Sequence, residues 1–242
     1  MLDVTEPPQI DIVFQHEDFL VLNKPAGFSV QELSEIYQKS FNAFHPVHRL
    51  DKETSGLWLV ALNSNANGHL SRLFANQQIE KHYVAILPAG KKLKKKQGWI
   101  KGDMQKARRK AWKLCKSQLN PAVTFFQTNA FTVQTAENSL IISKSQNNLR
   151  TLRLAYLQPL TGKTHQLRVA MKANGAAILG DDIYAGEQAK TEQRLYLHAY
   201  KLIFQYQSHL YKFECMAKQG EYFLQQSFQQ VLSKFEPKAL QR

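Results

Sequence analysis

The chain has 242 residues, of which 43% are hydrophobic and 21% charged, a composition typical of a folded protein with a buried core. No apolar run approaches the roughly 20 residues that span a bilayer, and the first residues lack the basic stretch that opens a signal peptide. The sequence therefore excludes an integral membrane protein and predicts a cytoplasmic one. The two cysteines, Cys115 and Cys215, form no CxxC pair, which excludes a disulfide scaffold or a zinc finger.

The hydrophobic pattern predicts short strands that alternate with helices. Strands are expected at residues 10–15, 19–23, 58–62, 82–87, 122–128, 140–144, 149–157, 195–205 and 209–217. Helices are expected at residues 33–44, after a cap at Ser64, at 164–174 and at 224–235. Strands joined by hairpins, with occasional helices, indicate an α+β fold with a mixed, mainly antiparallel β-sheet core and flanking helices. We expect a single domain over residues 1–242.

The net charge is +13, and one segment carries nearly all of it. Residues 91–116, called here the basic segment, hold twelve Lys or Arg and one acid, a net +11, whereas the rest of the chain holds 20 basic and 18 acidic residues. Trp99 and Trp112 interrupt the basic segment, and a polyanion would bind to it through the release of counterions. We interpret the segment as a nucleic-acid contact, with a solvated loop or exposed face as the alternative. The residues expected to contact the nucleic-acid backbone are Lys92, Lys94, Lys95, Lys96, Arg108 and Arg109.

The polar stretch of residues 48–57 leads into the strand expected at 58–62. Within it Asp51 is flanked by Arg49 and Lys52, whose positive charges would keep its carboxylate ionised. A fixed, ionised carboxylate can act as a nucleophile or a general base. The spacing alone also fits a structural alternative, in which Asp51 caps a turn and Arg49 pairs with it at the surface.

The stretch of residues 160–169 contains Gly162, Lys163 and Thr164, which superficially resemble a phosphate-binding loop. That loop needs a glycine five positions before Gly162, where Leu157 lies, so binding of a nucleoside triphosphate is excluded. If a helix begins near Thr164, its free amides together with Lys163 would suit an RNA phosphate. An ordinary capped surface helix is the alternative.

Five sequence blocks, taken together and in order, resemble the RluA-type pseudouridine synthase family. They are VLNKPAG at 21–27, HRLDKETSGL at 48–57, KHYVA at 81–85, TGKTHQLRV at 161–169 with its continuation to 186, and RLYLHA at 194–199. The resemblance extends over about residues 10–217. It implies the pseudouridine synthase catalytic fold and an RNA pseudouridine synthase, an isomerase that converts uridine to pseudouridine.

The resemblance also implies residue roles. Asp51 matches the essential aspartate, Tyr83 the active-site tyrosine that stacks on the target base and helps move its C5 proton, and Arg168 the basic residue that pairs with the aspartate. Arg49 matches the arginine that enters the RNA as the target base leaves, and Leu197 an apolar residue that lines the uracil pocket. The other positions expected to contact the substrate are His48, Thr54, Lys163, Thr164, His165 and Gln166.

Two positions depart from the family pattern. After Gly27 the family usually has a Val-His pair, but here Val30 is followed by Gln31. Lys163 replaces the usual arginine, which keeps the charge but loses the bidentate geometry toward a phosphate. Neither departure affects Asp51, Tyr83 or Arg168.

The implied reaction breaks the C1′–N1 glycosidic bond, turns the uracil and rejoins it through C5. Nothing is oxidised and no group is added, so we expect no metal, nucleotide or redox cofactor. No pair of histidines has the spacing of metal ligands, which supports the same expectation. Whether Asp51 attacks C1′, attacks C6 or removes a sugar proton stays open.

The family's S4-like RNA-binding domain is expected to be absent, because only about nine residues precede the first strand. Recognition would then depend on the catalytic domain and the basic segment, which favours a compact tRNA or rRNA stem-loop and a monomeric enzyme. Two other classes remain as alternatives. A non-catalytic RNA-binding module would keep the basic segment, and a hydrolytic nucleosidase would use a carboxylate at C1′ but release free uracil.

Overall fold

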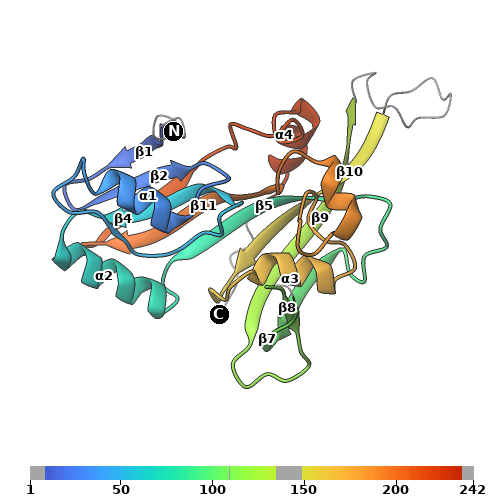
Figure 1. Cartoon of the computed structure of the whole chain (residues 1–242), viewed down its shortest axis with the longest axis horizontal. Coiled ribbons are helices and arrows are strands. Elements are labelled where there is room, and N and C mark those ends of the chain that lie inside the picture. The colour runs from blue at the N-terminus through green and yellow to red at the C-terminus, as the bar shows by residue number, and fades with distance from the viewer. Residues whose placement is uncertain (1–8, 109, 135–148, 236–242) are drawn as a thin grey trace, which may run out of the picture. The chain divides into compact units, whose positions relative to one another are not determined.

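The computed structural model describes residues 9–108, 110–134 and 149–235, which divide into two compact units. The first unit is the chain up to Tyr83 together with Leu197–Ala217, and the second is Val84–Tyr196 together with the chain from Lys218 onward. Strand β5, Glu80–Pro88, begins in the first unit and ends in the second (Figure 1).

The first unit contains a mixed sheet and two helices. Its elements are β1 (Asp11–Gln15), β2 (Phe19–Lys24), α1 (Val30–Tyr37), β3 (His45–Pro46), β4 (Ser55–Ala61), α2 (Ser64–Ala75), β11 (Leu197–Tyr206) and β12 (His209–Glu214). The strand order is β1-β2-β4-β11, with β3 paired to β4 and β12 paired to β11. β4 and β11 are parallel, and β1 with β2, β2 with β4, β3 with β4 and β11 with β12 are antiparallel, so the sheet is mixed, as predicted.

Both faces of this sheet are buried. Alternate residues of a strand point to opposite faces, and each set packs in its own cluster. Phe19 and Val21 of β2 pack in one cluster with Leu70 of α2. Leu20 and Leu22 pack in a second cluster, which includes Leu33 of α1. The two helices therefore account for the nearly continuous apolar character of β2, which is buried along its whole length.

A glycine is required where β4 meets β11. Gly56 has φ +114°, a backbone conformation that side-chain-bearing residues rarely adopt, and a Cβ atom there would lie 2.4 Å from the carbonyl oxygen of Ala199. The parallel pairing of His198 with Ser55 and of Ala199 with Gly56 thus depends on the absence of a side chain. This contact ties the strand that follows Asp51 to the strand that begins at Leu197.

The second unit contains the basic segment and a long hairpin. Its elements after β5 are β6 (Gln97–Gly102), β7 (Met104–Lys106), β8 (Trp112–Leu114), β9 (Ala122–Gln134), β10 (Leu149–Pro159), α3 (Gln166–Ala173), the 3₁₀ helix Gly186–Thr191 and α4 (Gln226–Leu232). The strand order is β5-β10-β9-β6, and β7 and β8 form a separate two-stranded sheet. β9 pairs with β10 and with β6 in antiparallel register.

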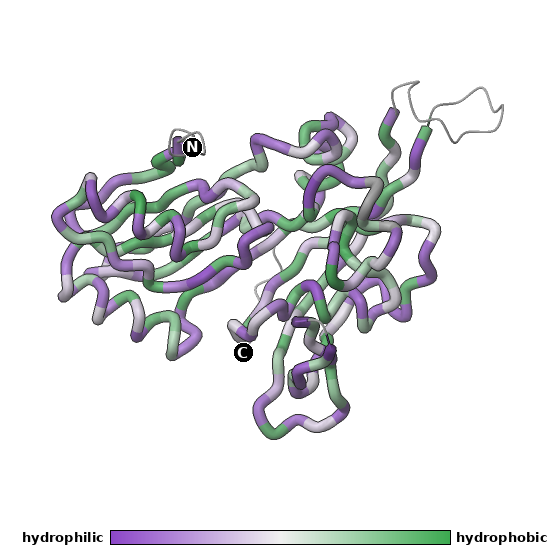
Figure 2. The backbone as a smooth tube through the Cα atoms, in the orientation of Figure 1, coloured by the Kyte–Doolittle hydropathy of each residue, from purple (hydrophilic) through white to green (hydrophobic). Residues whose placement is uncertain are grey.

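The core of the second unit lies between this sheet and its helices. Phe131 of β9 packs edge-on against Phe228 of α4, with ring centroids 5.6 Å apart. Leu167 and Met171 of α3 are buried, as the helical spacing predicts. Figure 2 shows hydrophobic residues along the central strands of each unit.

Most of the predicted elements are confirmed, and four predictions need correction. The helix predicted at 33–44 is α1, which ends at Tyr37, although Phe44 is buried with it. The cap of α2 is Asn63, whose side chain accepts a hydrogen bond from Ala66 N at 2.8 Å, and Ser64 is the first helical residue. The helix predicted from Thr164 begins at Gln166. The basic segment includes strands that were not predicted.

The strand predicted at 140–144 and the turn predicted at 144–148 lie outside the described residues. Among the residues that the structure describes, no helix combines the length and the apolar character needed to cross a bilayer.

Candidate active site

Asp51 lies in a tight turn between a buried leucine and β4. The backbone N–H of Thr54 donates to the carbonyl oxygen of Asp51 at 3.0 Å, which closes the turn. Leu50 is buried in the same cluster as α1, and Thr54 is buried as well, so both ends of the turn are anchored. Asp51 itself is half-buried, whereas Arg49 is exposed. The turn therefore presents a carboxylate in a fixed position.

A buried lysine, Lys24, holds this turn in place through hydrogen bonds to backbone carbonyls. The ammonium group of Lys24 donates to three carbonyl oxygens, those of Pro25 at 2.7 Å, Phe28 at 2.6 Å and Lys52 at 3.1 Å. Because a buried charge is stable only where it is well hydrogen-bonded, these carbonyls must stay in place around it. The N–H of Gly27 also donates to the Lys52 carbonyl at 3.0 Å. Residues 25–28 and the Asp51 turn are thus held together.

Lys24 had no predicted role. The only signal was its place in the first family block, since burial of a lysine cannot be read from spacing.

Tyr83 lies on β5 and packs, half-buried, against the cluster that contains Leu50. Burial raises the pKa of its phenol, and the nearby negative charge of Asp51 raises it further. The hydroxyl is therefore protonated throughout the neutral range. Asp51 and Tyr83 are close enough to interact electrostatically, as the resemblance implies for two residues that act on one base.

His48 is held inside the first unit by its ring. Its Nε2 atom accepts a hydrogen bond from the N–H of Leu59 at 2.9 Å, and the ring stacks on Phe74 with centroids 4.5 Å apart. Burial, and then the positive charge of Lys81, lower the pKa of His48 to about 3, so the imidazole is neutral. The structure therefore gives His48 a packing role; its predicted contact with the substrate stays a prediction.

A chain of hydrogen bonds connects the Asp51 turn to β11. The Nε2 atom of His198 lies 2.8 Å from the carbonyl oxygen of Cys215, to which it can only donate. Its Nδ1 atom then accepts from the Ser55 hydroxyl, 2.8 Å away. Both side chains are buried, and they directly follow Thr54 and Leu197 in the sequence. Leu197, buried at the start of β11, is thereby positioned relative to the turn.

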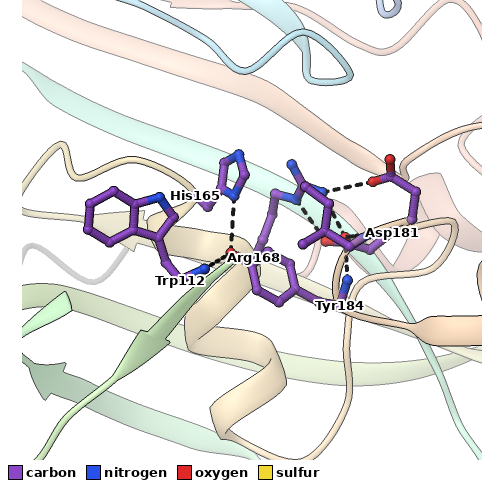
Figure 3. Close-up of polar contacts among 7 residues, drawn as sticks. Trp112, His165, Arg168, Asp181 and Tyr184 are labelled. Atoms are coloured by element: carbon purple, nitrogen blue, oxygen red, sulfur yellow. Dashed lines mark hydrogen bonds and ion pairs between the residues drawn. The ribbon is translucent and has the colours of Figure 1, made fainter. Parts of the chain in front are cut away.

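Arg168 lies in the second unit, on α3, where two carboxylates hold it (Figure 3). Its Nε atom donates to Asp181 Oδ2 at 2.8 Å and its Nη2 atom to Asp181 Oδ1 at 2.7 Å. Nη2 also donates to Asp182 at 3.1 Å, and the guanidinium lies 5.3 Å from the ring centroid of Tyr184. Arg168 and Asp181 are both buried. The predicted pairing of Arg168 with Asp51 stays a prediction.

The hydroxyl of Tyr184 joins the start of α3 to the basic segment (Figure 3). It accepts a hydrogen bond from the N–H of Trp112 at 2.8 Å and lies 3.0 Å from Nδ1 of His165. His165 has φ +55°, a left-handed conformation that costs energy for a residue with a side chain. The Tyr184 contact supports this conformation, which turns the backbone into α3.

Gln166 is the most completely hydrogen-bonded of the predicted substrate residues. Its Oε1 atom accepts from the Thr161 hydroxyl at 2.7 Å and from the N–H of Lys163 at 3.0 Å. Its Nε2 atom donates to Val123 O and Thr124 Oγ1, both at 3.0 Å. These four bonds use the hydrogen-bonding capacity of the amide. The structure thus assigns Gln166 to positioning the loop; its contact with the substrate stays a prediction.

The other residues of this loop are more accessible. Lys163 and Thr164 are half-buried, and the Lys163 ammonium donates to the side chain of Asn120 at 2.7 Å.

The lysines of the basic segment are exposed, but their backbone is fixed. Asn174 is buried and binds this backbone in three places: its carbonyl accepts from Lys94 N at 2.8 Å, its side chain accepts from Lys95 N at 3.1 Å and donates to Lys95 O at 3.0 Å. Thr128 donates to Lys96 O through its N–H and through its hydroxyl. The side chains of Lys92, Lys94, Lys95, Lys96 and Arg108 are exposed, and Arg109 lies outside the described residues.

The predicted site residues thus fall into two groups. Those in the first unit are His48, Arg49, Asp51, Thr54, Tyr83 and Leu197. Those in the second unit are Lys163, Thr164, His165, Gln166, Arg168 and the basic segment.

Comparison with known proteins identifies the family of the chain. A model of the RNA pseudouridylate synthase family matches residues 18–173, which include Asp51, Tyr83 and Arg168. The chain is 43% identical to an uncharacterized RNA pseudouridine synthase of Haemophilus influenzae, over 92% of this chain and 95% of that one. It is 33% identical to the dual-specificity RNA pseudouridine synthase RluA of Pasteurella multocida, over 85% of this chain and 92% of the relative.

A solved structure has the same fold. The human RNA pseudouridylate synthase domain containing 1 superposes with a TM-score of 0.73, at 25% identity, over 95% of this chain and 96% of that chain. The α+β fold with its mixed sheet is therefore confirmed. On these grounds the chain belongs to the RNA pseudouridylate synthase family and is an isomerase that converts uridine to pseudouridine in RNA.

Proposed function

We propose that Asp51 carries the reaction, and that the substrate is a uridine in a tRNA or rRNA stem-loop. The observation that supports the role of Asp51 most directly is the set of hydrogen bonds that holds the Asp51 turn. The three carbonyls around the buried Lys24 ammonium and the anchored Thr54 fix the carboxylate before the substrate arrives. A catalytic group that is positioned in advance does not have to be ordered during the reaction.

The chemistry needs one carboxylate and a proton acceptor. Cleavage of the C1′–N1 bond frees the uracil, which turns and forms the C1′–C5 bond. The C5 proton must then leave, and N1 must gain one, so atoms and charge balance without a cofactor. During this rearrangement Asp51 would either stabilise the sugar or the base, or form a covalent bond to one of them. The nearby phenol of Tyr83, which stays protonated, would stack on the base and relay the C5 proton.

Arg168 is proposed as the basic residue of the reaction. The support from the second unit is its rigidity, since both oxygens of Asp181 and one of Asp182 hold the guanidinium. A guanidinium held by two parallel hydrogen bonds keeps one orientation. Arg49, which is exposed, would enter the RNA stack as the target base leaves.

The exposed lysines of the basic segment would bind the RNA backbone. Phosphate contacts supply most of the affinity and fix the orientation of a nucleic acid, but they do not read its sequence. The name "ribosomal large subunit pseudouridine synthase C" of a Rickettsia bellii relative supports rRNA as a substrate, and the dual-specificity name of another relative supports more than one kind of RNA. We expect a monomeric, cytoplasmic enzyme.

The decisive experiment is product analysis with Asp51→Asn, which is nearly isosteric and uncharged. Wild-type protein should leave the mass of the RNA unchanged and create pseudouridine, whereas Asp51→Asn should bind RNA with similar affinity and create none. Glu53→Gln, a half-buried neighbour, is the matched control and should stay active. Activity of Asp51→Asn within about tenfold of wild type, which means a barrier raised by no more than about 1.4 kcal/mol, would contradict the proposal. Release of free uracil would indicate a nucleosidase, and unmodified uridine in the wild-type reaction a binding module.

A further inference from the structure

The second unit contains a cavity of about 600 Å³ that Asp51, Tyr83 and Arg168 do not line. It is bounded by the end of β5, the start of β10, the last turn of α3 and the chain that follows α3. Small residues make up much of its wall: Gly90, Gly175, Ala176, Ala177, Gly180 and Ala185. Half-buried Pro88, Ala177 and Ala185 give it an apolar surface.

Two of the wall glycines cannot be replaced by larger residues. Gly175 has φ +113°, and a Cβ atom there would lie 2.5 Å from the Lys92 carbonyl oxygen. Gly180 has φ +74°, and its Cβ would lie 1.8 Å from the Arg194 carbonyl oxygen. The packing of the chain behind the wall thus keeps this part of the cavity free of side chains.

The cavity is positively charged. Lys91, Arg150 and Lys172 line it, and none of its described lining residues is acidic. Arg150 is already bound, to Glu192 at 2.8 Å and to the Tyr222 hydroxyl at 2.6 Å. Lys91 and Lys172 are exposed and form no ion pair with a described residue. Two ammonium groups are therefore available to an anion at this cavity.

The size and the lining together identify the class of ligand. A single phosphate would leave most of the space empty, while a mononucleotide falls in the volume range of ordinary small-molecule sites. The apolar surface at Pro88, Ala177 and Ala185 suits the face of a base, and the two lysines suit its phosphate. Lys91 is also the first residue of the basic segment, so an RNA strand bound to the lysines that follow could continue into the cavity.

We propose that this cavity binds one unstacked nucleotide of the substrate RNA, other than the uridine that is modified. The proposal rests on the proposed function for the identity of the RNA, but the cavity and its charges are independent of Asp51. The nucleotide would contact Gly180 and Ala185, which flank the loop that carries Asp181, the partner of Arg168. A nucleotide bound in the cavity would thereby help to hold Asp181, and through it the Arg168 side chain, in place.

The test is a thermodynamic cycle between the cavity and the RNA, measured by binding alone on the full chain carrying Asp51→Asn. The RNA arm is a set of tRNA and rRNA stem-loops in which each loop nucleotide in turn is made abasic. The protein arm is Ala177→Trp, which fills the cavity. At one loop position outside the modified uridine, loss of the base should weaken binding about tenfold, as for other unstacked bases. In Ala177→Trp the same RNA change should weaken binding less than twofold.

Lysine variants give a second cycle in case the tryptophan disturbs folding. Lys91→Gln with Lys172→Gln should lower the salt slope of RNA binding by roughly one to two units and abolish the effect of a neutral methylphosphonate at the same loop position. Lys113→Gln with Lys116→Gln removes the same charge from exposed residues that do not line the cavity, and should keep the methylphosphonate effect.

The outcomes separate the possible sources of the nucleotide. If no loop position shows coupling to either cavity variant, the proposal is wrong. If uridine or adenosine 5′-monophosphate binds wild type and not Ala177→Trp, but no RNA position shows coupling, the cavity takes free nucleotides and the proposal is also wrong. Because binding is measured with an inactive protein, these results do not depend on product formation, and active Asp51→Asn protein would contradict only the proposed function.

Discussion

The Asp51 turn and the basic segment are each held by a buried polar side chain, but the two differ in what they leave exposed. Lys24 binds the turn through carbonyl oxygens and lies in a region where Leu50 and Thr54 are also buried. Asn174 binds the basic segment only through backbone atoms, and the lysine side chains extend into solvent. The reacting group is thus partly removed from water, where electrostatic effects are strong, whereas the binding groups stay accessible to phosphates.

The largest expected effect is on the reaction rate, and it tests the residues that react with the base near the Asp51 turn. Tyr83→Phe keeps the ring but removes the hydroxyl, so RNA binding should be unchanged while the single-turnover rate falls by about 10² or more, the usual range for loss of an acid–base group. Tyr83→Ala should lower both the rate and the affinity. Tyr37→Phe, which alters a hydroxyl that binds Ile10 N at 3.1 Å, is the control for a phenol away from the reaction. Equal rates for Tyr83→Phe and wild type would show that the hydroxyl takes no part in proton transfer.

The next largest effect is on RNA affinity, and it tests the lysines of the basic segment. Replacement of Lys92, Lys94, Lys95 and Lys96 by Gln should weaken binding to all RNAs by a similar factor, about 10 to 100 at low salt, and lower the salt slope by roughly one unit per lost phosphate contact. The turnover of the saturated complex should change little. The measurement is affinity at several salt concentrations together with single-turnover rates. The control, with the same change in charge, is the replacement by Gln of Lys39, Lys201, Lys212 and Lys218. An unchanged salt slope in the first variant would mean that its lysines are only solvated.

The smallest effect sharpens the role of burial near Asp51. The pKa of His48 is lowered to about 3 in the folded chain, so its contribution to stability is present above pH 6.5 and is lost as the pH falls toward 3. Between pH 7 and pH 5 the free energy of unfolding should fall by about 1–2 kcal/mol from this group alone. His48→Gln should lose that part of the pH dependence, and His209→Gln, at an exposed position, should keep it. Identical pH dependence in His48→Gln and wild type would contradict an imidazole that stays neutral in the folded chain.

Among the described residues outside the basic segment, local patterns predicted most of the strands, because alternation and apolar runs are properties of a few neighbouring residues. They predicted the helix ends less well. Ser64 and Asn63 are both good capping residues, and only the structure shows that Asn63 accepts the bond. Thr164 is an acceptable helix start, but His165 adopts the left-handed conformation and delays α3 to Gln166.

The candidate site was predicted from resemblance rather than from spacing, and the missing parts are long-range. Gln166 reads as a polar residue available to a substrate, but its amide binds Val123 and Thr124, more than 40 positions earlier. Lys24 had no predicted role, but it is fully buried. Neither result follows from neighbouring residues, because the partners of a buried polar group are set by the tertiary fold.

The attachment of the basic segment to Asn174 has a consequence for the thermodynamics of RNA binding. Fixing one residue of a flexible chain costs about 1–2 kcal/mol of conformational entropy, and a disordered basic tail would incur this cost when it folds onto RNA. Here residues 94–96 are ordered before binding by Asn174 and Thr128. Association should accordingly proceed without the large negative heat-capacity change that accompanies coupled folding, and the enzyme can release a modified RNA without unfolding the segment that held it.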